Sequence, residues 1–71
     1  MNTIVMDTRY DGYAVVTSNV TGTDAYITRV WETGAGRVRQ TRACYGYIKA
    51  KRMHAKLSDW AADLSRALVT P

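Results

Sequence analysis

The sequence predicts an α+β fold in which a four-stranded antiparallel meander is followed by one C-terminal helix (ββββα). Residues 2–44 divide into four β-like stretches that are separated by short turns rich in Gly, Asp and Thr. From residue 47 onward, apolar residues instead recur at spacings of 3 and 4, which is typical of an amphipathic helix. The 71 residues make one domain, 1–71. A domain of this size buries only about 60% of its unfolded surface, so we expect a homodimer to add buried area.

The four strands are predicted from alternation and turn residues. Asp11-Gly12 between two alternating runs is a strong hairpin pattern, because a type I′ turn needs positive φ at its central residues. Turns are also expected at residues 21–24 and 33–36. The predicted strands are 2–10, 13–20, 25–32 and 37–44.

The turns predict a register that divides the side chains between two sheet faces. It pairs Tyr10 with Tyr13, Val15 with Val30, Trp31 with Val38 and Glu32 with Arg37. The face expected beneath the helix collects Ile4, Met6, Tyr10, Tyr13, Val15, Tyr26, Thr28, Val30, Thr41 and Ala43. The opposite face collects Val5, Asp7, Arg9, Val16, Ser18, Ile27, Arg29, Trp31, Val38, Gln40 and Arg42. A slip or a bulge would exchange the faces.

The helix is predicted at residues 47–69, before Pro71. Its core-facing stripe is Ala50, Met53, Leu57, Trp60, Leu64 and Ala67, widened by Ala61 and Leu68. Basic residues crowd the first half, whereas Asp59 and Asp63 come later. The helix dipole favours the opposite order by roughly 0.3–1 kcal/mol per charge, so these cations are expected to serve a contact outside the helix.

Positive charge is concentrated in one window. The net charge is +4, yet residues 37–56 hold seven bases and no acid: Arg37, Arg39, Arg42, Lys49, Lys51, Arg52 and Lys56. Such clustering indicates a polyanionic partner such as nucleic acid. A solvated basic surface that keeps a small protein soluble is the alternative.

Aromatic side chains accompany these cations. The predicted register places Trp31, Arg29, Gln40 and Arg42 on the face away from the helix, and Tyr45 and Tyr47 lie between the last strand and the helix. Aromatic rings stack on bases while cations neutralise phosphates. The alternatives are that Trp31 is a dimer contact and that one tyrosine closes the end of the core.

The sequence gives little support for a catalytic or metal-binding site. The chain has one His and one Cys, and no third group is evident that would orient His54 as a base for Cys44. The alternative is a solvated His54 and a small buried Cys44. A metal site needs more ligands than this pair supplies. Asp59 and Asp63 are expected to form surface ion pairs with Lys56 and Arg66. We therefore expect no enzyme activity, no metal and no cofactor.

The single cysteine and the lack of an apolar leader or membrane-length run predict a cytoplasmic protein with no membrane partner. In that setting the Asn19-Val20-Thr21 sequon has no role.

The layout resembles two groups of proteins. The ββββα order, with the Trp and Leu spacing of KLSDWAADLSRAL, is similar to single-strand binders of the Whirly and PUR type, whose sheets meet nucleic acid. In size and layout, the stretch from Tyr13 to Leu68 also resembles small phage-encoded inhibitors of the anti-CRISPR type. That resemblance implies a phage-infected bacterial cell as the setting. Many of those inhibitors mimic DNA with acidic surfaces, whereas this chain is basic.

These observations predict a small non-enzymatic module that binds nucleic acid or a nucleoprotein complex. The expected site residues are Arg29, Trp31, Arg37, Arg39, Arg42, Lys49, Lys51, Arg52 and Lys56. The alternative is an inhibitor that blocks a host complex by direct contact with an acidic protein surface.

Overall fold

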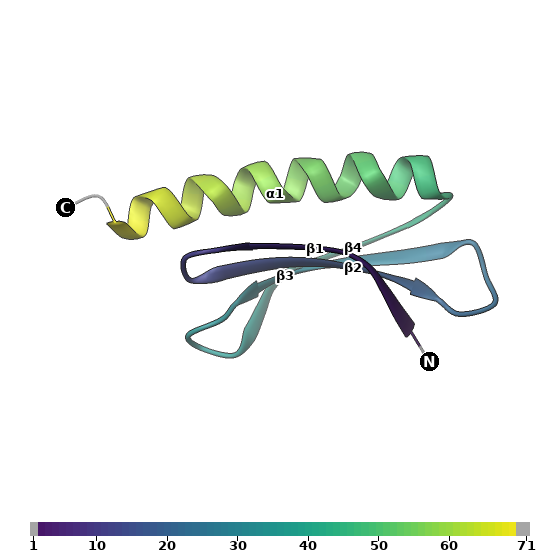
Figure 1. Cartoon of the computed structure of the whole chain (residues 1–71), viewed down its shortest axis with the longest axis horizontal. Helices are drawn as coiled ribbons and strands as arrows, with labels where there is room; N and C mark the ends of the chain where they lie inside the picture. The colour runs from purple at the N-terminus through teal and green to yellow at the C-terminus, as the bar shows by residue number, and fades with distance from the viewer. Residues whose placement is uncertain (1, 70–71) are drawn as a thin grey trace.

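One long helix lies across one face of an antiparallel sheet, and no described element covers the other face (Figure 1). The structure is a computed structural model that describes residues 2–69. The sheet has four strands in the order β1-β2-β3-β4, so each strand pairs with its neighbour in sequence. The predicted α+β fold, a ββββα meander, is therefore confirmed.

The element bounds match the predicted ones within one residue. The strands are β1 (Asn2–Tyr10), β2 (Tyr13–Val20), β3 (Ala25–Glu32) and β4 (Arg37–Tyr45), and the helix is α1 (Tyr47–Val69). Pro71, which we expected to follow the last helical turn, lies outside the described residues.

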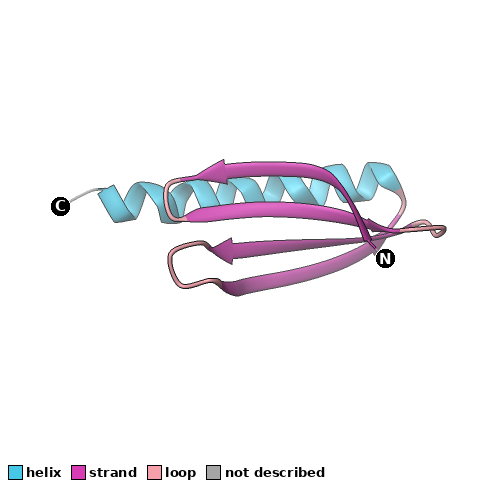
Figure 2. Ribbon diagram, turned by 60° about the horizontal axis from the view of Figure 1, so that its bottom comes forward, coloured by secondary structure: helices cyan, strands magenta, loops and turns pink. Residues whose placement is uncertain are grey.

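The β1–β2 turn and the last turns of α1 meet at one end of the molecule. Figure 2 shows the β1–β2 and β3–β4 turns at the end where α1 finishes. Gly12 has φ +80°, but no described residue other than glycine has a positive φ, so Asp11 does not adopt the conformation that the predicted type I′ turn needs. The hydroxyl of Ser65 donates a hydrogen bond to the carbonyl oxygen of Asp11 at 2.8 Å, which ties α1 to this turn.

The predicted register is confirmed at the hairpin ends and in the sheet centre. Tyr10 pairs with Tyr13, and Val15 pairs with both Thr8 and Val30. Glu32 pairs with Arg37, the expected pair of opposite charge.

Two bulges correct the predicted faces. In β4, Val30 pairs with Gln40 while Trp31 pairs with Val38, so Arg39 is an extra residue. The bulge reverses the alternation beyond it. Gln40 and Arg42 therefore lie on the helix side, and Thr41 and Ala43 on the open side, contrary to the prediction.

The second bulge lies in β1. Ile4 pairs with Ser18 and Met6 with Thr17, which leaves Val5 as the extra residue. Met6 keeps its predicted place beneath the helix. Ile4 does not, because it shares the open face with Ser18 and is exposed.

The core lies between the centre of the sheet and the middle of α1. Its buried residues are Tyr13, Val15, Val30, Leu57 and Ala61, with Tyr10, Met53, Trp60 and Leu64 packed around them. The predicted helical stripe is thus largely correct. Its C-terminal end is not, because Ala67 and Leu68 are exposed.

Candidate functional site: a cation-rich helix surface

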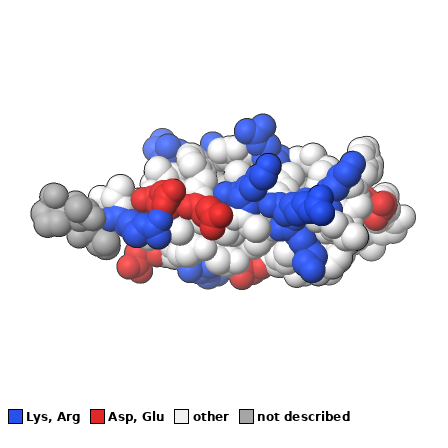
Figure 3. Space-filling view, turned by 90° about the horizontal axis from the view of Figure 1, so that it is seen from above, with Lys and Arg blue, Asp and Glu red and all other residues white. Residues whose placement is uncertain are grey.

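Four cations lie in the first half of α1, and we name them the α1 cation cluster: Lys49, Lys51, Arg52 and Lys56. All four are exposed. None forms an ion pair with an acid among the described residues. In Figure 3, lysine and arginine side chains gather over this half of the helix, whereas acidic side chains lie over the other half.

The start of α1 places these cations against the helix dipole, as the sequence predicts. The first turn contains no acidic residue, and Arg66 is the basic residue of the last turn. Gly46 has φ +93°, and its carbonyl oxygen accepts the first helical hydrogen bond, from the Ala50 N–H at 3.1 Å. The α1 cation cluster therefore sits near a helix N-terminus that already carries partial positive charge, and both attract anions.

A tyrosine pair supports the beginning of the cluster. The Lys51 ammonium lies 5.7 Å from the centre of the Tyr47 ring, and that ring lies 5.9 Å from the ring of Tyr26 on β3. Neither Tyr45 nor Tyr47 closes the end of the core, because the two residues are 75% and 49% exposed. Both are therefore accessible to a partner.

Arg37 and Arg39 are separated from the cluster. Both pair with Glu32, Arg37 at 3.0 Å and Arg39 at 3.1 Å. They follow the β3–β4 turn, at the end of the molecule where α1 finishes, whereas the cluster occupies the other half of a molecule 45 Å long. Their charge is partly compensated, so they are weaker candidates than the sequence suggested.

Arg42 lies on the helix side of the edge strand β4. It pairs with Thr28, and Thr28 hydrogen-bonds Thr17 beneath the helix. Its guanidinium donates to the side-chain oxygen of Gln40 at 2.9 Å and forms no ion pair with a described acid. Arg42 therefore faces the same side as α1 and not the side of Trp31, which corrects the predicted basic–aromatic face.

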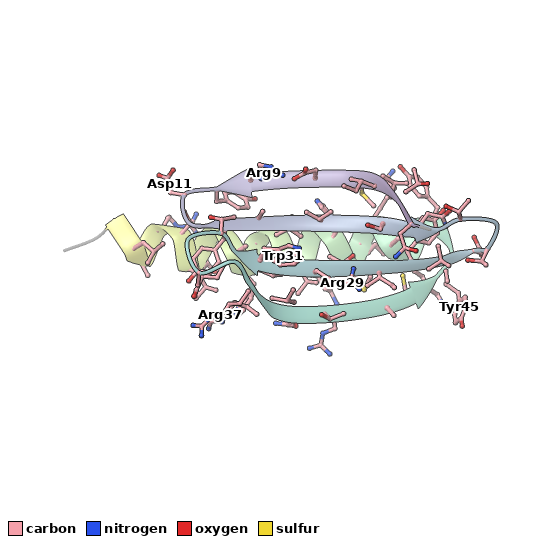
Figure 4. The ribbon with its side chains drawn as sticks, turned by 90° about the horizontal axis from the view of Figure 1, so that it is seen from below. Arg9, Asp11, Arg29, Trp31, Arg37 and Tyr45 are labelled. Carbon is pink, nitrogen blue, oxygen red and sulfur yellow. The ribbon has the colours of Figure 1, made fainter. Side chains whose placement is uncertain are left out.

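Trp31 and Arg29 lie on the open side of the sheet. Figure 4 shows both on β3 in the view of the face away from α1. Trp31 is 36% exposed and borders a shallow hollow of about 280 Å³, which Arg9, Ala14, Val16, Thr33 and Gly36 also line. The predicted site residues therefore divide between the helix side, the open side of the sheet that carries Trp31 and Arg29, and the β3–β4 end that carries Arg37 and Arg39.

His54 is buried, which overturns the expectation that it is solvated. Its Nδ1 lies 2.7 Å from the hydroxyl of Thr17 and its Nε2 lies 2.9 Å from the hydroxyl of Thr8. Burial lowers the pKa of His54 below 6.5, although the nearby Asp7 carboxylate partly opposes this. Cys44 is half-buried, and no hydrogen bond joins it to His54 among the described residues. The ring is thus held by threonines and not arranged as a base for the thiol.

The ion pairs and the possible metal ligands of the described residues do not form a further candidate site. Arg66 pairs with Asp63 as predicted, whereas Asp59 forms no ion pair with Lys56. No three His, Cys, Asp or Glu side chains of the described chain gather where they could hold a metal ion. No helix in residues 2–69 is long and apolar enough to cross a membrane.

The geometry therefore gives one surface suited to anions and one suited to apolar contact. No protein-family model, curated protein or solved structure matches the chain.

Proposed function

We propose that this chain is a small non-enzymatic module that binds nucleic acid, free or within a nucleoprotein complex, through the α1 cation cluster and Arg42. The observation that carries the proposal is a set of exposed cations without acidic partners in residues 2–68, all on the α1 side of the sheet. No described element covers that side of α1 (Figure 1).

The spacing of the cluster suits a chain of phosphates. Lys49, Arg52 and Lys56 recur at i, i+3 and i+7, so they form a row along one side of α1. At 1.5 Å of rise per residue the row is about 10 Å long. Mutual repulsion within this row is relieved when phosphates replace counterions between the cations, which favours binding of a polyanion.

Salt dependence tests the proposal. If about four of these five cations meet phosphates, the logarithm of affinity should fall with the logarithm of salt concentration at a slope near −3 for a single strand and near −4 for a duplex. The measurement is fluorescence anisotropy of a labelled oligonucleotide across a salt series. No binding at low salt, or binding that ignores salt, would contradict the proposal and leave the cations as a solvated surface.

Two charge-matched variants locate the site. Lys49→Gln/Lys56→Gln removes two cations from the cluster and should flatten the single-strand slope by about 1.5. Arg37→Gln/Arg39→Gln also removes two cations, but from residues that pair with Glu32, so it should change the slope much less. The reverse order of effects would move the site to the β3–β4 end.

The open sheet face favours a second candidate, an inhibitor that blocks a host complex by protein–protein contact. Large apolar side chains are exposed there, including Ile4, Trp31 and Val38. Under this alternative, nuclease-treated lysate should yield one protein that binds the parent chain but not a Trp31→Asp variant. Nucleic acid affinity with the steep salt slope would favour the first candidate.

A further inference from the structure

The open face of the sheet consists of rows of paired side chains centred on β2. In one row Val16 lies between Asp7 on β1 and Arg29 on β3. In the next row Ala14 lies between Arg9 and Trp31. In a third row Ser18 lies between Ile4 and Ile27. The small residues of β2 thus form the centre line of the face, with larger or charged residues on both sides.

The flanking residues are complementary across that centre line. In the first row, Asp7 and Arg29 are opposite in charge. In the second row, Arg9 is a cation and Trp31 is an aromatic ring. In the third row, Ile4 and Ile27 are both apolar. Neighbouring strands are about 4.8 Å apart, so the backbones of partners on β1 and β3 are about 10 Å apart. Asp7 pairs with Arg9 in its own chain and forms no ion pair with Arg29.

We propose that two copies of this chain pack open face to open face about a two-fold axis that runs along β2. Such an axis exchanges β1 and β3 while keeping each row in place. Asp7 of each copy then lies opposite Arg29 of the other, and the half-buried Arg29 gains a carboxylate that no described acid of its own chain supplies.

The other two rows complete the contact. Arg9 of each copy lies over Trp31 of the other, in the arrangement of a cation–π pair. Ile4 of each copy lies against Ile27 of the other. Sheets packed face to face keep their strands within about 30° of each other, which this axis permits.

Charge decides the position of the axis. An axis between β2 and β3 would overlap all four strands, but it would set Arg29 against Val16 and bury the guanidinium without an acid, which is costly. The axis along β2 overlaps three strands and satisfies both charges.

The available area is sufficient for a small dimer. Three strands of about eight residues, at 3.3 Å per residue and 4.8 Å between strands, cover roughly 14 by 26 Å. Two such faces with their protruding side chains bury roughly 1,000 Å² in total, the lower bound of a specific interface. The assembly places both α1 cation clusters on the outside, so it goes beyond the proposed function without depending on it.

Charge exchange tests the dimer by sedimentation equilibrium. Asp7→Arg and Arg29→Asp each place like charges opposite one another and should raise the dimer dissociation constant roughly 30-fold or more. The double variant Asp7→Arg/Arg29→Asp restores opposite charges at both contacts and should recover the dimer. Lys56→Glu, on the other side of the molecule, is the control and should leave the dissociation constant unchanged.

Circular dichroism on each variant separates loss of the dimer from loss of the fold. A parent chain that remains monomeric at high micromolar concentration would overturn the proposal. So would single variants that dimerise as the parent does, or a folded double variant that stays monomeric. A monomeric parent whose Trp31→Ala variant loses oligonucleotide affinity would instead assign the open face to nucleic acid.

Discussion

The Nδ1 atom of His54 on α1 lies 2.7 Å from the hydroxyl oxygen of Thr17 on β2. Thr17 in turn lies 2.6 Å from the hydroxyl of Thr28 on β3, and His54 Nε2 reaches Thr8 on β1. A neutral ring satisfies both contacts in either tautomer, because one nitrogen donates and the other accepts. This buried network therefore links the helix to three strands and fixes its place on the sheet.

Replacing Thr17 with its apolar isostere should destabilise the fold. Thr17→Val leaves His54 Nδ1 and the Thr28 hydroxyl without their shared partner, at a cost of about 1–3 kcal/mol in the free energy of unfolding. Thr3→Val is the control, because the hydrogen bond between the Thr3 and Thr21 hydroxyls is exposed and its loss should change stability by less than about 0.5 kcal/mol. Chemical denaturation measures both, and equal effects would contradict the structural role of the network.

Acidification should weaken the fold through His54. Burial lowers its pKa in the folded chain below 6.5, so the unfolded chain binds a proton more readily. The contribution of His54 to the free energy of unfolding is then highest above pH 6.5, falls as the pH drops from 6.5 through the folded pKa, and levels off below it. NMR should give a His54 titration midpoint below 6.5. A His54→Gln variant should lose this pH-dependent part of the free energy of unfolding. A His54 titration midpoint at or above 6.5 in the parent chain would contradict the prediction.

A side chain at Gly12 should destabilise the fold, for two separable reasons. Its φ of +80° is strained for other residues by about 1–2 kcal/mol, and an added Cβ would lie 2.5 Å from Leu68 Cδ1. Gly22 has a similar φ of +85° with open space around it, so Gly22→Ala measures the strain alone. Thermal unfolding should show that Gly12→Ala is the more destabilising change. In a Leu68→Ala background the difference should disappear, and its persistence would exclude the contact with Leu68.

Trp31→Ala should leave the chain folded. Trp31 lies on the face away from α1, so its removal opens no cavity in the core. Val30→Ala, one residue earlier, truncates a fully buried side chain and should cost a substantial part of the about 1.5–3 kcal/mol that burying a valine contributes. Circular dichroism and denaturation compare the two variants. A Trp31→Ala variant that is less stable than Val30→Ala would mean that the faces are reversed.

Local sequence patterns were enough to predict most of the fold. Asp11-Gly12 predicted the position of the first hairpin because Gly12 readily adopts positive φ, although the predicted type I′ turn was wrong. The Glu32–Arg37 pair followed from the length of the β3–β4 loop. The helix bounds followed from the period of its apolar residues.

The bulges could not be predicted from those patterns. An extra residue at Val5 or Arg39 costs little locally, and its place is decided by which neighbours the whole sheet buries. Because each bulge shifts the alternation by one residue, the position of Arg42 relative to Trp31 was wrong while every strand bound was nearly right.

In the candidate site, too, some features follow from local sequence patterns and others from the tertiary structure alone. The sequence alone determined that Lys49, Arg52 and Lys56 share one helical row, because a row follows from the helical repeat. Only the tertiary structure decided which partners the ring of His54 has, since Thr8 and Thr17 lie 46 and 37 residues away in the chain. Likewise, Glu32 partly neutralises the charges of Arg37 and Arg39 because the β3–β4 hairpin brings these three side chains together. Periodicity within one element can be read from the chain, whereas the surroundings of a side chain depend on contacts between elements.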